Sequence, residues 1–196
     1  MTLASERSEF IRKVYLNLAM GFAGFIALES VLVTWQPAVE LAQKMVAGNN
    51  WLIVLLAVMG VSWVANAWAV NGATLSKQYA GFALYVIAES VIFLPLLIVS
   101  NSIAHDTIPQ AGIITAALTA GISAYAFFSK KDFSFLGSFL TIASFVALGI
   151  IVCAILFGMQ LGLWFSGAMI IFAGLVVLYQ TSAIIRQYRN DQYVAA

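Results

Sequence analysis

Apolar residues are gathered in six long stretches of the chain, and short polar segments separate them. The stretches cover residues 14–35, 51–71, 78–100, 111–128, 133–157 and 161–185. Each is close to the roughly 20 residues that an α-helix needs to cross a hydrocarbon core. The stretches are apolar around the whole helix circumference and lack the alternation of a membrane β-strand. The pattern therefore predicts six membrane-spanning helices.

The composition agrees with a membrane protein. Hydrophobic residues make up 63% of the chain and charged residues 9%, whereas soluble domains carry about 25% charged residues. The six stretches and their connections use nearly all of the 196 residues. We therefore expect an all-α, polytopic helix bundle that forms a single integral membrane domain over residues 1–196, with the lipid bilayer as partner. The net charge of +1 and the lack of a basic stripe exclude nucleic-acid binding.

The distribution of Lys and Arg predicts the orientation of the helices, because cytoplasmic connections are enriched in these residues. With six spans, the two tails and the second and fourth connections share one side of the membrane. The other side carries only Lys44, in the first connection. We expect both termini of this chain to face the cytoplasm. The basic residues on that side are Arg7, Arg12, Lys13, Lys77, Lys130, Lys131, Arg186 and Arg189.

The sequence offers little that could support catalysis. Cys153 is the only cysteine and His105 the only histidine, so neither a disulfide within the chain nor a zinc site of Cys and His ligands can form. No nucleophile is accompanied by a base in the pattern. We expect a protein that is not an enzyme and that carries no cofactor.

Two carboxylates lie inside predicted spans, where a charge costs on the order of 2.5–3.5 kcal/mol. Glu89 follows Lys77 by 12 residues, or roughly 18 Å along the helix, and so lies near the middle of the membrane. Pro95 cannot donate an amide hydrogen bond and frees the carbonyl of Val91. Glu89 is therefore a candidate cation ligand or proton acceptor with a helix kink beside it. The alternative is a protonated Glu89 that bonds a neighbouring helix.

Glu29 is the second candidate for an ion pathway. It follows Lys13 by 16 residues, or roughly 24 Å along the first helix, and so lies nearer to the outer face. The alternative is an interfacial role in which the carboxylate reaches water.

The segment "SKKDFSFLGSFL", residues 129–140, places three charges between two apolar stretches. Lys130 and Lys131 suit a short turn on the cytoplasmic face. Asp132 stands where the fifth helix begins, so its carboxylate can cap free amide groups there. From the residues alone, a topology signal and a helix cap account for this segment.

The same segment resembles the signature of the Bax inhibitor family, the transmembrane Bax inhibitor motif proteins, which include bacterial members. The stretches "ALYVIAESVIFLPLL" and "IFAGLVVLYQTSAIIRQY" resemble further parts of that family. The resemblance implies a seven-helix fold and, for a bacterial-type member, a place in the inner membrane. It also implies one of two functions. The first is a pH-sensitive leak with calcium as the transported ion, and the second is regulation of a membrane-bound AAA protease or another membrane protein in stress or cell death.

The sequence departs from the family pattern at two places. In calcium-leak members, an aspartate of the sixth helix shares a proton with one of the seventh, and "LYQTS" puts Gln180 at the first of these positions. Gln180 can hydrogen-bond but cannot titrate. The second aspartate has no counterpart before the sequence ends at "RNDQYVAA". Either the protein is naturally short or the chain is cut short before a seventh helix, and we expect the second.

These observations lead to two functional hypotheses. The first is a regulated calcium or proton-coupled cation leak, with Glu89 as the ligand in the membrane. The alternative is a non-conducting regulator, which the loss of the paired aspartates favours.

Overall fold

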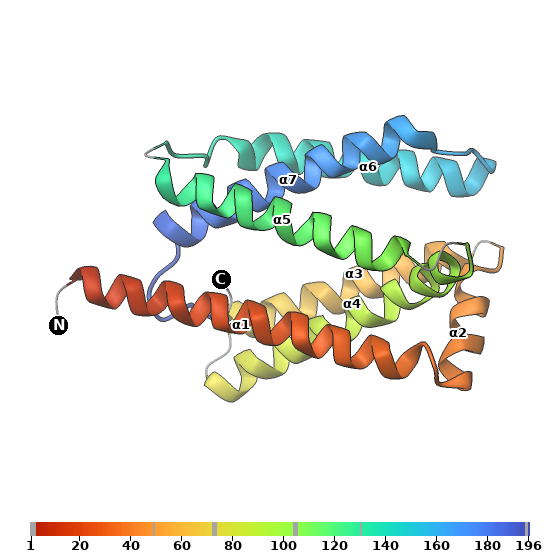
Figure 1. The fold of residues 1–196 in the computed structure, drawn as a ribbon, viewed down its shortest axis with the longest axis horizontal. Helices are drawn as coiled ribbons and strands as arrows, with labels where there is room; N and C mark the ends of the chain where they lie inside the picture. Colours follow the sequence, from red (N-terminus) through yellow and green to blue (C-terminus); the bar gives the residue numbers. More distant parts are fainter. Residues whose placement is uncertain (1–2, 49, 72–73, 104–105, 130, 195) are drawn as a thin grey trace. The chain divides into compact units, whose positions relative to one another are not determined.

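The protein is a set of α-helices in a computed structural model that describes residues 3–48, 50–71, 74–103, 106–129, 131–194 and 196 (Figure 1). The described residues contain no β-strand. Six of the helices are long and apolar enough to cross a membrane, and α2 is not. The all-α fold and the six predicted spans are thus confirmed. The helices are α1 (Leu3–Leu32), α2 (Gln36–Val46), α3 (Asn50–Asn71), α4 (Leu75–Ile103), α5 (Thr107–Phe128), α6 (Leu136–Phe157) and α7 (Gly162–Arg186).

The observed helices differ from the predicted spans mainly at their ends. α1 begins at Leu3 because the polar segment before the first apolar stretch continues the same helix. An ion pair of 2.9 Å between Glu9 and Lys13, one turn apart, lies in this added part. Hydropathy identifies only the part of a helix that suits a membrane interior, so it does not show where a polar extension of the same helix begins.

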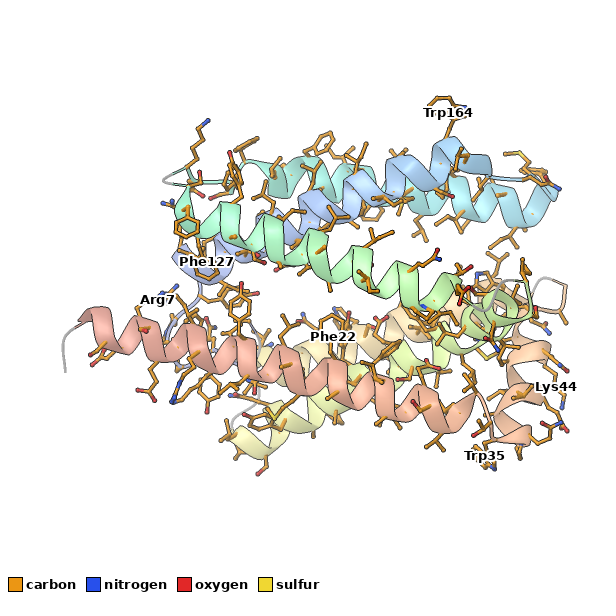
Figure 2. All side chains as sticks on the ribbon, in the orientation of Figure 1. Arg7, Phe22, Trp35, Lys44, Phe127 and Trp164 are labelled. Carbon is orange, nitrogen blue, oxygen red and sulfur yellow. The ribbon has the colours of Figure 1, made fainter. Side chains whose placement is uncertain are left out.

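The sequence pattern predicts only a connection between the first two spans, but the structure has α2 there. Pro37 lies in its first turn, where the missing N–H of proline would be unpaired in any case. The buried residues of α2 recur at spacings of three and four and therefore share one face; they are Ala38, Ala42 and Met45. Lys44 is exposed, and Figure 2 shows its side chain directed away from the helix. α2 is an amphipathic helix of 11 residues, too short to be recognised as a membrane span from its hydropathy.

The chain divides into two compact units, and the first comprises Met1–Ile108 together with Arg189–Ala196. Within it, α3 and α4 approach closely at Gly81, where a Cβ atom would lie 2.6 Å from the carbonyl oxygen of Ala65. Small residues allow such close helix contacts in membranes. A second close approach joins α1 and α4, since a Cβ atom on Gly21 would lie 2.9 Å from the ring of Phe82.

The segment after α7 belongs to the first unit and packs against α1. The Arg7 guanidinium donates a hydrogen bond of 2.9 Å to the Asn190 side chain. The Asn17 amide donates one of 3.0 Å to the carbonyl of Tyr193. Asn17 is itself buried and accepts a hydrogen bond from the Tyr79 hydroxyl of α4 at 3.2 Å. The tail thereby supplies a hydrogen-bond partner for Asn17, a polar residue that α1 buries.

The second unit comprises Pro109–Tyr188 and contains most of α5 with α6 and α7. α6 and α7 pack closely at Gly137, where a Cβ atom would lie 3.1 Å from the Tyr179 ring. α6 ends at Gly158, which adopts the left-handed conformation with φ of 67° and so suits glycine. The division into units leaves the expected single membrane domain a prediction.

Candidate functional site

A polar groove with a volume of about 480 Å³ lies along α6 and α7 in the second unit. We call it the α6–α7 groove. Three of its hydroxyl residues, Ser138, Thr141 and Ser144, recur every three residues along α6 and therefore lie on one helix face, whereas Ser134 lies in the turn before this helix. The polar residues that line it are Ser134, Ser138, Thr141, Ser144, Tyr179 and Gln180.

The groove presents oxygen atoms as hydrogen-bond acceptors. The Thr141 hydroxyl donates to the carbonyl of Gly137 at 2.9 Å, and the Ser144 hydroxyl donates to the carbonyl of Leu140 at 2.8 Å. A hydroxyl has one proton and two lone pairs. Because each proton is used within α6, the lone pairs of these oxygens remain for a ligand in the groove. Such oxygens suit a cation or a ligand that donates hydrogen bonds.

Asp132 and Ser134 form a tight turn where α6 begins. The Asp132 carboxylate accepts hydrogen bonds from the Ser134 hydroxyl and, at 3.0 Å, from the Ser134 backbone N–H. These two hydrogen bonds, together with the charge of Arg186, hold the pKa of Asp132 below its usual value. Asp132 therefore carries a negative charge next to Ser134, which lines this end of the groove.

The expected helix cap takes a different form. α6 begins at Leu136, and its N-cap residue Phe135 makes no side-chain cap hydrogen bond. Asp132 bonds the amide of Ser134 instead, so it closes the turn ahead of the helix. Lys131 is exposed, and its backbone carbonyl accepts a hydrogen bond of 3.0 Å from Arg186. Lys130 lies outside the described residues.

Two sequence motifs meet at the groove. The backbone N–H of Phe133 donates a hydrogen bond of 3.3 Å to the Ser182 hydroxyl, and the Gln187 amide donates one of 3.2 Å to the Ser134 hydroxyl. The "SKKDFSFLGSFL" turn is therefore fastened to the end of α7. Gln180, at the position of the family's sixth-helix aspartate, is exposed and lines the groove.

Glu89 lies in the first unit, in the interior of α4, and is partly buried. Tyr85, one turn earlier, interacts with its carboxylate. Pro95 is buried inside α4, six residues further along. Glu89 and Pro95 are thus both in the interior of α4, and the role of Glu89 as a cation ligand or proton acceptor stays a prediction. Among the described residues, no group of three or more His, Cys, Asp and Glu could hold a metal ion.

Glu29 is more deeply buried than Glu89. Its exposed fraction is 5%, and neither carboxylate oxygen has a hydrogen-bond partner among the described residues. The interfacial alternative, with a carboxylate that reaches water, does not match this burial. Glu29 and Glu89 belong to the first unit and Gln180 to the second.

The hydroxyl residues of α6 were not among the residues predicted to form a site. Ser138, Thr141 and Ser144 are separated by three residues each, a spacing that places them on one helix face, and Ser134 precedes α6 in the adjoining turn. This spacing was visible in the sequence. The sequence could not show that Tyr179 and Gln180 of α7 complete the groove, because only helix packing brings them next to α6.

Comparisons with known proteins give the relatives of this chain. The family described as "Inhibitor of apoptosis-promoting Bax1" matches residues 7–196. An uncharacterized protein of Pseudomonas aeruginosa is 29% identical over 97% of this chain and 81% of its own length. Protein LIFEGUARD 4 of Arabidopsis thaliana is 27% identical over 95% of this chain and 76% of its own length.

Protein LIFEGUARD 1 of the same plant is 27% identical over 97% of this chain and 81% of its own length. No solved structure matches the chain significantly. The family match covers both compact units and all six long apolar helices. The chain is therefore a multi-pass integral membrane protein that belongs to the Bax inhibitor family.

Proposed function

We propose that this protein is a regulated cation leak in a bacterial inner membrane, with calcium as the transported ion. The observation that supports the proposal best is the α6–α7 groove, because its oxygen atoms lie on helices that are otherwise almost entirely apolar. Hard cations such as Ca²⁺ bind oxygen ligands, including neutral ones. The hydroxyls of Thr141 and Ser144 have already donated their protons within α6, so their oxygens are available to replace water around the ion.

The charge at the end of the groove supports the same proposal. Asp132 is exposed and ionised, and Ser134 connects it to the groove lining. An exposed carboxylate raises the local concentration of cations, more so at low salt. Glu89 is proposed as a further ligand or proton acceptor in α4, where it is partly buried.

Calcium flux into liposomes that contain the purified full chain tests the leak. The double variant Thr141→Val, Ser144→Ala removes two groove hydroxyls at nearly constant volume. Each lost oxygen contact is worth about 1 kcal/mol, or roughly fivefold in flux. The matched control is Ser166→Ala, because Ser166 also donates to its own helix, at 3.4 Å, but does not line the groove.

The double variant and Ser166→Ala together show whether a loss of calcium flux is specific to the groove hydroxyls or follows from removal of any helix hydroxyl. The leak proposal requires flux through the native chain and Ser166→Ala, and reduced flux through the double variant. No flux above empty liposomes, or equal flux through all three proteins, contradicts it. A parallel measurement on Glu89→Gln shows whether Glu89 takes part, and unchanged flux removes it from the pathway.

The second candidate function is that of a non-conducting regulator of a membrane-bound AAA protease or another membrane protein in a stress response. Gln180 favours it, because an amide at this position cannot gate by protonation. Purification of the tagged chain from its native membranes tests this function. A stoichiometric protein partner together with absent calcium flux supports the regulator, whereas calcium flux without such a partner contradicts it.

A further inference from the structure

The carboxylate of Glu29 lacks a compensating group. The side chain is 5% exposed, and neither oxygen has a hydrogen-bond partner among the described residues. Moving an unpaired charge into apolar surroundings costs several kcal/mol. A proton or a bound cation must therefore neutralise the carboxylate in this packing.

Neighbouring residues show which surface Glu29 occupies. The Phe25 ring, one turn earlier, meets the Phe93 ring of α4 edge-on, with 5.4 Å between centroids. Leu32, three residues later, packs against the cluster of Ala38, Ala42 and Leu94 from α2 and α4. Residues at spacings of four and three share one helix face. Glu29 therefore lies on the face of α1 that packs against α4 and α2.

A second buried polar group lies on the opposite side of this interface. Ser90 of α4 is 1% exposed, and its hydroxyl donates to the carbonyl of Val86 at 3.0 Å. Val86 lies against α1, since a Cβ atom on Gly24 would be 3.7 Å from it. Ser90 follows Val86 by one turn and precedes Leu94 by one turn, so it shares their face. Its oxygen keeps lone pairs that can bind a cation.

We propose that Glu29 is a buried exchange site for a proton and a monovalent cation such as Na⁺, with the Ser90 oxygen as a second ligand. The closed packing holds the protonated carboxylic acid. In the exchange, the O–H bond of the acid breaks, the proton passes to water, and the carboxylate binds the cation. One carboxylate balances one positive charge, whereas a divalent ion would leave an uncompensated charge in the interior.

No other ionisable group on the helices that pack against α1 is placed to neutralise the Glu29 carboxylate among the described residues. α1 packs against α4 and α2. On α4, Glu89 and Tyr85 interact with each other, and on α2, Glu40 and Lys44 are exposed. The remaining charged and titratable groups of α1 and of the elements beside it belong to the other end of this unit. The contacts that join them to α1 involve residues no later than Asn17, which precedes Glu29 by 12 residues. These groups are Glu6, Arg7, Glu9, Arg12, Lys13 and Tyr15 of α1, Lys77 and Tyr79 of α4, and Arg189, Asp191 and Tyr193 of the tail.

Dicyclohexylcarbodiimide tests the site without any measurement of flux. This apolar reagent adds to protonated carboxyl groups in apolar surroundings and leaves a stable N-acylurea, which mass spectrometry locates on a peptide. The full chain in liposomes is labelled over a range of pH in choline chloride, and then with Na⁺ or Ca²⁺ in place of choline at equal ionic strength. We expect labelling of Glu29 that falls as pH rises, that Na⁺ reduces at least fivefold, and that Ca²⁺ reduces less.

Three variants complete the experiment. Glu29→Gln is expected to lose the label at this position. Glu89→Gln is expected to keep both the label on Glu29 and its protection by Na⁺. Ser90→Ala removes one ligand and is expected to raise the Na⁺ concentration for half-protection about fivefold, while the label itself persists.

The proposal is overturned if Glu29 is not labelled at any pH, if Na⁺ leaves the labelling unchanged, or if Ca²⁺ protects as well as Na⁺ does. Unchanged half-protection in Ser90→Ala removes the second ligand and also contradicts the site as proposed. None of these results depends on whether the α6–α7 groove conducts, so the two proposals fail separately.

Discussion

Neutral hydrogen-bond partners determine how the polar and charged side chains of this protein behave. Two hydrogen bonds from Ser134 lower the pKa of Asp132. The groove hydroxyls of α6 become acceptors because they donate to their own helix. Glu29, in contrast, has no partner among the described residues. The chemistry of these residues follows from their local partners, and residue type alone does not define it.

The variant Ser134→Ala is expected to raise the pKa of Asp132 towards its usual value of about 3.9. The change removes the hydroxyl that contributes most to the lowered pKa in the folded chain. A lowered pKa contributes stability above the unfolded-state value, and this contribution is lost as pH falls through the folded-state value. NMR titration of the Asp132 carboxyl carbon measures the shift. Ser138→Ala, which leaves the turn intact, is the control, and equal pKa values in both variants would contradict the assignment.

The variant Gln180→Asp is expected to make the activity of the groove dependent on pH. Gln180 is exposed on the groove lining, and a carboxylate there can be neutralised by a proton, whereas the amide cannot. If the groove conducts calcium, flux through the variant should decrease as pH is lowered, and flux through the native chain should change less. Liposome flux at several pH values measures this, with Gln180→Asn as control. Identical pH profiles for all three chains would exclude position 180 from the pathway.

Helix packing depends on small residues at particular contacts. Gly81 allows α4 to approach the backbone of α3, with space for no Cβ atom beside Ala65. Gly60 of α3 has no atom within 4 Å of the place where a Cβ would lie. The two glycines are in apolar helices of similar composition, and only their contacts distinguish them.

The variant Gly81→Ala is therefore expected to destabilise the packing of α3 on α4, by about 1–3 kcal/mol, as overpacked cores do. Gly60→Ala is expected to leave stability nearly unchanged or slightly raised, because alanine favours a helix over glycine. Unfolding of both purified variants with increasing SDS in mixed micelles measures the difference. Equal midpoints for the two variants would show that the close approach at Gly81 does not determine stability.

The part of the chain that the structure describes contains six long apolar helices, and the basic residues are distributed unequally among the connections and tails. This distribution predicts that the tails share the cytoplasmic side and that α2, with Lys44, lies outside. The packing of the tail on α1 in the first unit agrees with a common side for the two ends, because Arg7 bonds Asn190 directly.

Cysteine labelling tests this orientation. In a Cys153→Ala background, single cysteines are placed at Ser8, Asn190 and Ala47, all of which are exposed. We expect a membrane-impermeant maleimide to label Ala47→Cys in intact cells, and Ser8→Cys and Asn190→Cys only after permeabilisation. Labelling of Ser8→Cys and Asn190→Cys from opposite sides would overturn the even number of spans.

The sequence predicts the spans well and the sites only in part. The six apolar stretches correspond to α1, α3, α4, α5, α6 and α7 because the membrane requires long apolar helices. α2 escapes this pattern because its apolar face is narrow and its length is 11 residues. Glu89 and Glu29 could be recognised as costly residues within spans, but the sequence could not show that Glu29 is the more deeply buried of the two.

The sequence by itself determined the membrane location, the number of spans and the family, since these depend on composition and on short motifs along the chain. Only the tertiary structure decided which polar atoms lack hydrogen-bond partners and which polar residues from different helices lie side by side. The four hydroxyl residues Ser134, Ser138, Thr141 and Ser144 became a groove only when α7 packed beside α6. Glu29 became an unpaired carboxylate only when α4 and α2 covered its face of α1. The reason is physical: hydropathy is a property of the chain, whereas burial and hydrogen bonding depend on neighbours that are distant in the sequence.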